Sequence, residues 1–113
     1  MPTLITAIIK RSRLDPVRDA LQEVGAAGLT VCEVRGYGRQ GGQVETYRGT
    51  EYRSDFIQKL RLDLVVADEL VDVAIAAIKD AAATGKIGDG KLWSVPVDRV
   101  VRLRTGEEGD EAI

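Results

Sequence analysis

The residue types in this chain that could do chemistry are glycines and cationic side chains, and they cluster. Residues 84–91 read Thr-Gly-Lys-Ile-Gly-Asp-Gly-Lys. Glycines let successive backbone N–H groups form a concave anion-binding nest, and neighbouring lysines add positive charge. The spacing from Gly85 to Lys91 imitates the GxxxxGK phosphate loop of nucleotide hydrolases. That loop needs Ser or Thr next, where Leu92 stands, and it must run from strand to helix, whereas here a predicted helix leads into a strand. We therefore expect an anion site rather than a hydrolase loop; a helix end followed by a flexible turn is the alternative.

A pair of arginines forms the second cationic feature. Arg102 and Arg104 lie in a strand predicted over Arg99–Thr105. Residues i and i+2 of a strand point to the same face, about 7 Å apart. Two guanidiniums at that spacing suit a polyphosphate, although alternating arginines also occur on solvated strand faces. Together with residues 84–91, the pair predicts a nucleotide-phosphate site.

A long connection supplies the third feature. From Gly36 to Asp55 it runs for about twenty residues between two predicted strands, where a hairpin usually needs about two to five. It holds Tyr37, Tyr47 and Tyr52, which are most of the aromatic residues in the protein. Loops often carry recognition and modification sites, so the tyrosines are candidates for either role. The alternative is a solvated excursion whose tyrosines pack back on the body.

The chain contains no histidine and a single cysteine, Cys32. This composition excludes Ser-His-Asp and Cys-His nucleophilic sites, His-ligated zinc, internal disulfides and Cys-rich metal sites. Cys32 stands in the middle of a predicted strand, where we expect a buried structural thiol. No pair of carboxylates has a recognisable catalytic motif, so we expect no enzyme. A weak ATPase that uses Asp89 or Lys91 is the alternative.

The charge distribution favours small anionic ligands. The net charge of −2 becomes +2 when the four acids of the C-terminal tail, residues 106–113, are left out. A mildly basic body without a clear basic stripe suits a small anion better than a nucleic acid. No stretch approaches the roughly 18 apolar residues of a membrane span, and no secretory leader is evident. We expect no membrane insertion and a cytoplasmic location.

The elements that must position these residues follow from hydrophobic periodicity. Leu4–Ile9 is apolar on both alternating faces, which predicts a strand buried on both sides. Asp15 and Asp68 each precede apolar residues at helical spacing and are expected to cap two helices, which end near glycines. The further predicted strands are Leu29–Arg35, Phe56–Ala67, Lys91–Val95 and Arg99–Thr105.

The resulting order is strand, helix, strand, long loop, strand, helix, strand. This is the split βαβ arrangement of a ferredoxin-like α+β sandwich, and we expect one such domain over residues 1–113. Two helices cover one face of the sheet, and the doubly apolar Leu4–Ile9 strand implies a cover on the other face. Because no further chain remains, another subunit is the expected cover.

Four segments in this order resemble the PII nitrogen-regulatory signal-transduction proteins, and the resemblance runs nearly end to end. They are Gly36–Gln40 (GYGRQ), Tyr47–Tyr52 (YRGTEY), Thr84–Lys91 (TGKIGDGK) and Arg102–Glu107 (RLRTGE). The resemblance implies a non-enzymatic homotrimer of ferredoxin-like subunits whose sheets face inward. It also implies that ATP or ADP binds in clefts between subunits and that 2-oxoglutarate binds together with Mg-ATP. The T-loop, about residues 37–55, would then engage or release targets in nitrogen metabolism.

The site residues of the family carry over by position. Those implied to hold phosphates are Gly88, Asp89, Gly90 and Lys91 of one subunit, Arg102 and Arg104 of its neighbour, and Gly38 and Arg39 nearby. Those implied to line the adenine and ribose pocket are Thr30, Gly36 and Val65. By the same resemblance, Gln40 would reach both Mg²⁺ and 2-oxoglutarate, and Lys59 would pair with a carboxylate of 2-oxoglutarate. Tyr52 matches the tyrosine that some members have uridylylated or adenylylated.

The resemblance also implies partners for the T-loop. They are target proteins such as an ammonium transporter or a nitrogen-regulatory enzyme, and a nucleotidyltransferase that acts on Tyr52. Thr50 stands where the modification motif usually has Ala or Ser, and Arg11 and Gln58 replace usual prolines. These departures suggest a divergent paralogue with a target of its own. A PII-like sensor of another small effector is the remaining alternative.

Overall fold

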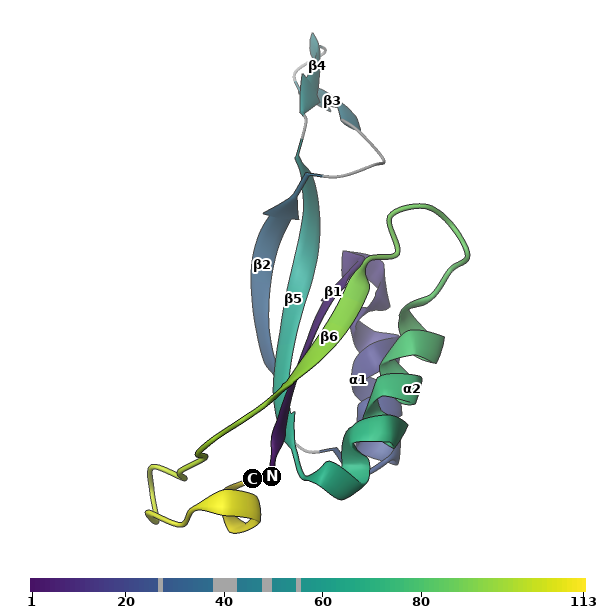
Figure 1. The fold of residues 1–113 in the computed structure, drawn as a ribbon. Helices are drawn as coiled ribbons and strands as arrows, with labels where there is room; N and C mark the ends of the chain where they lie inside the picture. The colour runs from purple at the N-terminus through teal and green to yellow at the C-terminus, as the bar shows by residue number, and fades with distance from the viewer. Residues whose placement is uncertain (27, 38–42, 48–49, 55) are drawn as a thin grey trace.

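Four antiparallel strands form one sheet in the order β2-β5-β1-β6. The computed structural model describes residues 1–26, 28–37, 43–47, 50–54 and 56–113, and between residues 38 and 55 it describes backbone only. The strands of the sheet are β1 (Thr3–Ile9), β2 (Thr30–Gly36), β5 (Ile57–Val66) and β6 (Lys91–Pro96). With one helix between β1 and β2 and another between β5 and β6, this is the predicted split βαβ sandwich (Figure 1).

The predicted long loop contains a hairpin of its own. β3 (Gln43–Tyr47) and β4 (Thr50–Ser54) pair antiparallel in a separate two-stranded sheet. Valine, threonine and tyrosine in these segments favour extended backbone. The hairpin stands beyond the ends of β2 and β5, the strands that lead into and out of it (Figure 1).

Both helices lie on one face of the sheet (Figure 1). α1 (Leu14–Glu23) and α2 (Val71–Ala82) each follow a short 3₁₀ turn, Arg11–Arg13 and Asp68–Leu70. The capping predictions for Asp15 and Asp68 were wrong, because these turns shift the helix starts and neither N-cap side chain makes a capping hydrogen bond. Asp15 lies in the first turn of α1, and Asp68 instead accepts a hydrogen bond from the Met1 ammonium at 2.8 Å.

The hydrophobic core fills the space between the helices and the sheet. Alternate residues of β1 and β5 face it, and the register sets Ala7 opposite Leu62, two side chains that are fully buried. The buried residues of this core are Ile5, Ala7, Ile9, Val17, Leu21, Ala26, Leu60, Leu62, Leu64, Val66, Ala74, Ile78 and Ala82. The apolar positions that predicted the strands and helices from periodicity are therefore the positions that pack.

Neither α1 nor α2 lies over the other face of the sheet (Figure 1). Thr6 lies on this face and is buried at 1% exposure, and its hydroxyl donates to Asp63 at 2.7 Å. Cys32 lies on the same face, opposite Arg61 in the register, and is exposed. The expectation of a buried thiol was wrong for the single subunit, because Cys32 lies on the edge strand β2, where its side chain is exposed.

The segment after β6 does not form the predicted strand over Arg99–Thr105. It holds one isolated bridge, between Val101 and Glu108, and a turn closed by a hydrogen bond from Gly106 N to the Arg102 carbonyl at 2.8 Å. The prediction failed because a strand needs a neighbour, and this segment leaves the sheet after Pro96. The two arginines therefore do not share a strand face within one subunit.

Candidate functional site

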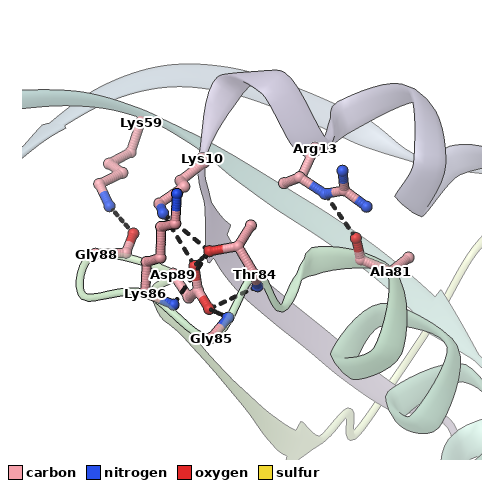
Figure 2. A network of polar contacts seen from close by, with 9 residues as sticks. All are labelled: Lys10, Arg13, Lys59, Ala81, Thr84, Gly85, Lys86, Gly88 and Asp89. Carbon is pink, nitrogen blue, oxygen red and sulfur yellow. Dashed lines mark hydrogen bonds and ion pairs between the residues drawn. The ribbon is translucent and has the colours of Figure 1, made fainter.

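The loop between α2 and β6, residues 83–90, is organised by one carboxylate. Asp89 accepts hydrogen bonds from Thr84 N at 2.8 Å and Gly85 N at 2.9 Å, and from the Thr84 hydroxyl (Figure 2). Lys10, at the end of β1, lies 3.1 Å from the same carboxylate. Two of the N–H groups that predicted an anion nest therefore bind Asp89, and this internal anion holds the loop against the end of the sheet.

These contacts keep Asp89 ionised. Hydrogen bonds from the Thr84 side chain and backbone, with smaller contributions from Lys10 and Gly85, hold the pKa of Asp89 far below its ordinary value. A carboxylate whose pKa is lower in the folded state stabilises the fold above its unfolded pKa, and loses that contribution as the pH falls through the folded pKa. The stabilisation that Asp89 gives to the loop should therefore be lost only in strong acid.

We expect Asp89→Asn to lower the melting temperature at neutral pH, because asparagine cannot supply the charge that Lys10 and the Thr84 contacts bind. The difference from the wild type should be constant above about pH 5 and should shrink below the ordinary pKa of 3.8. Thermal melts between about pH 2 and pH 8 measure it. Glu23→Gln, at the exposed end of α1, is the control and should change the melting temperature little. A difference that grows as the pH falls would contradict this role of Asp89.

Gly90 fixes the same loop through its backbone. Its φ is +94°, and a Cβ at this position would lie 1.8 Å from the carbonyl oxygen of Ile8. Only glycine allows so close an approach of two backbone segments. The loop is thus seated directly on β1 next to Lys91, the exposed first residue of β6.

Lys59 contacts the loop from β5. Its side chain points to the face opposite the core, is 7% exposed, and donates a hydrogen bond to the Gly88 carbonyl (Figure 2). Burial, and after it repulsion by Lys10, lowers the pKa of Lys59, while Asp89 acts in the opposite direction. No ion pair joins Lys59 to a carboxylate in the ranges that the structure describes. Among the described residues, the amine is therefore a buried cation whose hydrogen-bond partner is a neutral carbonyl, beside a glycine-rich loop.

The predicted base-pocket residues are divided between the two ends of the sheet. Gly36 ends β2 close to Lys59, whose Cγ lies 3.9 Å from a Cβ built on the glycine. Thr30 and Val65 lie at the opposite end and line a cavity of about 300 Å³ with Leu4 and the C-terminal Ile113. A strand of seven residues separates Thr30 from Gly36, which is about 20 Å.

The two arginines also lie far from the loop in their own subunit. Figure 1 shows the chain after β6 at the end of the sheet where both termini lie, and the loop before β6 at the other end. Arg102 contacts Glu107 at 3.2 Å and the Ile113 carbonyl at 3.1 Å, and Arg104 is exposed. The predicted site residues of one subunit therefore form two groups, called half-sites below, at opposite ends: the loop with Lys59, and the arginines with Thr30 and Val65.

Several sequence predictions concern residues whose side chains the structure does not describe. Gly38, Arg39 and Gln40 lie outside the described residues, and Tyr52 lies in β4, where only the backbone is described. Lys10 and Thr84, which bind Asp89, were not among the residues predicted to act at the site. Their signal was weak, since a lysine after a strand and a threonine before a glycine are common surface residues.

A family model described as Nitrogen regulatory protein P-II matches residues 2–107. The chain belongs to this P-II family. Nitrogen regulatory protein P-II of Pasteurella multocida (strain Pm70) is 56% identical over 109 residues, which are 96% of this chain and 97% of the relative. Nitrogen regulatory protein P-II 1 of Escherichia coli (strain K12) and Nitrogen regulatory protein P-II of Azospirillum brasilense are each 55% identical with the same coverage.

P-II proteins are non-enzymatic signal transducers of nitrogen status, and this chain shares that function. The family assembles as a trimer and its members bind ATP or ADP and 2-oxoglutarate. The ATPase alternative is therefore set aside. Neither helix of this P-II subunit, nor any other helix in the described ranges, has the length and hydrophobicity to cross a bilayer.

The trimer of the P-II family accounts for the two features that a single subunit leaves incomplete. A second copy can cover the part of the sheet on which Cys32 is exposed. It can also bring the arginine half-site of one P-II subunit to the loop half-site of the next, which no contact within one subunit does.

Proposed function

We propose that this P-II protein binds ATP or ADP in the clefts between its subunits, and 2-oxoglutarate together with Mg-ATP. The proposal rests on one observation above the others. Lys59 is a buried lysine with a lowered pKa, and its hydrogen-bond partner is the neutral carbonyl of Gly88. A bound carboxylate would supply the missing negative charge at the edge of the loop proposed to hold the phosphates.

The two half-sites define the roles of the remaining residues. Phosphates would contact the glycine loop and Lys91 of one subunit and the guanidiniums of Arg102 and Arg104 of the next, which suit phosphate geometry. Asp89 would act by holding the loop in place. The adenine and ribose would lie between Gly36 of one subunit and Thr30 and Val65 of the next, with Gly38 and Arg39 near the phosphates.

A magnesium ion fits this site only as part of the nucleotide complex. In the described residues, no group of three or more Asp, Glu, Cys or His side chains could hold a metal ion. Mg²⁺ is commonly bound through substrate phosphates and few protein ligands. Gln40 would offer a neutral oxygen, and the phosphates and the dicarboxylate would supply the negative charge.

The T-loop would report the bound state to a partner. Its arms continue from β2 and β5, and the latter carries Lys59, so a ligand at Lys59 touches the base of the loop. A ligand set that binds one T-loop conformation better shifts the population toward it. The proposed partners are an ammonium transporter or a nitrogen-regulatory enzyme in the cytoplasm, and a nucleotidyltransferase for Tyr52.

Calorimetric titration with ATP tests the shared cleft. We expect Arg102→Ala and Lys91→Ala each to weaken ATP binding by about tenfold or more, because each removes a charge-assisted hydrogen bond. The matched control is Arg99→Ala, which removes an exposed arginine of the same segment that pairs with Glu108. It should leave the affinity within about twofold. Equal losses from all three variants would contradict specific phosphate contacts.

Mixed trimers test whether the two halves come from different chains. Co-expression of Lys91→Ala chains with Arg102→Ala/Arg104→Ala chains should restore wild-type ATP affinity in about a third of the clefts of mixed trimers, since each cleft takes one half from each neighbour. No recovery in purified mixed trimers would place both halves in one chain.

A further inference from the structure

An apolar cavity lies beside residues 83–90, the proposed phosphate loop. Its volume is about 310 Å³, and it lies between α2, the end of β1 and the start of β6. Ile75, Ile78 and Ala82 of α2 line it, together with Ala83 and Leu92. The cavity lies next to the edge of the sheet, because β6 pairs with β1 on one side only. Asp89, Gly90 and Lys91 of the loop half-site form one wall of the cavity, and most of its lining is hydrocarbon.

The same chain carries one leucine that nothing covers. Leu103 is 97% exposed, well above any other large apolar side chain among the described residues. It stands between Arg102 and Arg104, in the turn that replaced the predicted strand. Burying a leucine side chain is favourable by about 1.5–3 kcal/mol relative to leaving it exposed. A fully exposed leucine between the two arginines of the proposed site therefore points to an apolar surface outside the subunit that covers it.

We propose that Leu103 of each subunit fills the apolar cavity of the neighbouring subunit. This inference rests on the proposed function, in which the flanking arginines reach the neighbour's phosphate loop. It adds the contact that would hold them there. The occupant is a second copy of this chain, as the trimer of the family provides.

Side chains alternate along a strand, so one extended segment can place the arginines at the phosphate loop and Leu103 at the cavity. On β6, Leu92 lies opposite Ala7 and faces the core side, whereas Lys91 lies opposite Ile8 and faces the other side. If residues 101–104 run extended along the free edge of β6, successive side chains also alternate. When Arg102 and Arg104 point to the Lys91 side, Leu103 points to the Leu92 side, where the cavity lies.

The inference also accounts for the failed strand prediction. The segment has the alternating sequence of a strand and lacks a neighbour in its own subunit, and the edge of β6 is an unpaired edge that can accept one. Pairing across the subunit boundary would give both strands their missing partner.

Disulfide trapping tests the contact directly. In a Cys32→Ser background, which removes the only native cysteine, Leu103→Cys chains are co-expressed with differently tagged Ala83→Cys chains. Oxidation should link the two tags, because a disulfide forms only when the Cα atoms come within about 7 Å. Val73→Cys in place of Ala83→Cys is the control, since Val73 is exposed on α2 and is not among the cavity residues. Linkage no greater than with Val73→Cys, in intact trimers, would overturn the proposal.

Substitution of Leu103 supplies an independent measurement. Because the side chain is exposed in the subunit, Leu103→Asp should leave the subunit fold, followed by circular dichroism, unchanged. We expect it to raise the protein concentration at which trimers dissociate, and to weaken ATP binding, by about tenfold or more each. Leu103→Met, which keeps an apolar side chain of similar size, should behave nearly as the wild type.

The outcomes separate this inference from the proposed function. If Leu103→Asp changes neither dissociation nor ATP affinity while Arg102→Ala weakens ATP binding, the leucine contact is wrong and the shared nucleotide cleft stands. If the wild type binds no ATP but the cysteines still link, the contact stands and the proposed function fails.

Discussion

Gly90→Ala is expected to lower the free energy of unfolding by about 3 kcal/mol or more. A φ of +94° is strained for any residue with a Cβ, at about 1–2 kcal/mol. The new Cβ would also lie 1.8 Å from the Ile8 carbonyl oxygen, a backbone atom in the central strand β1. Neither segment can move without breaking the pairing of Ile8 with Lys91. Urea unfolding of the variant and the wild type measures the difference.

Gly85→Ala is the matched control. Gly85 also has a positive φ, +80°, but a Cβ there would have no atom within 4 Å. It should therefore cost only the conformational strain, about 1–2 kcal/mol. ATP affinity should also fall in the Gly90→Ala protein that remains folded, because the loop must move away from β1 to make room for the new Cβ. Equal destabilisation by both substitutions would show that the contact with Ile8 is not what makes Gly90 necessary.

Lys59→Met is expected to weaken 2-oxoglutarate binding in the presence of Mg-ATP by about 30-fold or more, which corresponds to a loss of at least about 2 kcal/mol. Methionine keeps a flexible apolar stem of similar length and removes the charge. The carboxylate of 2-oxoglutarate would then be buried without its cation. Calorimetry with 2-oxoglutarate at saturating Mg-ATP gives the affinity.

The same substitution should leave the subunit at least as stable as the wild type. The lowered pKa of Lys59 means that burial works against its charge in the folded state, so removing the charge removes that penalty. ATP affinity in the absence of 2-oxoglutarate should stay within about threefold. Lys79→Met, on the exposed surface of α2, controls for the loss of one positive charge. Unchanged 2-oxoglutarate affinity in Lys59→Met would remove Lys59 from the site.

The fold could be predicted from the sequence where the signal was local. Leu60, Leu62, Leu64 and Val66 alternate with polar residues along β5, and all four are buried against the helices. The apolar spacing of α1 and α2 placed both helices to within a few residues. These patterns depend on side chains that repeat with the period of the element, which the sequence shows directly.

The predictions that failed depended on neighbours that are distant in the sequence or in another chain. Asp68 binds the N-terminal ammonium, 67 positions away, and not the start of a helix. The strand over Arg99–Thr105 has no partner within the subunit, and Cys32 has no cover there. None of these partners could be found from periodicity.

The residue types of the candidate site could be predicted from the sequence, but their arrangement could not. The glycines and lysines of residues 84–91 and the two arginines marked both half-sites by residue type. The sequence could not show that Asp89 binds the N–H groups of its own loop, nor that the half-sites lie at opposite ends of the sheet. The second fact is the stronger argument for a site shared between subunits.

Calorimetric titration of the wild-type trimer with 2-oxoglutarate, with and without saturating Mg-ATP, tests the central claim most directly. We predict binding that requires Mg-ATP, because the nucleotide brings the metal ion and completes the cleft around Lys59. If 2-oxoglutarate does not bind in the presence of Mg-ATP and another small metabolite binds there, the account is contradicted.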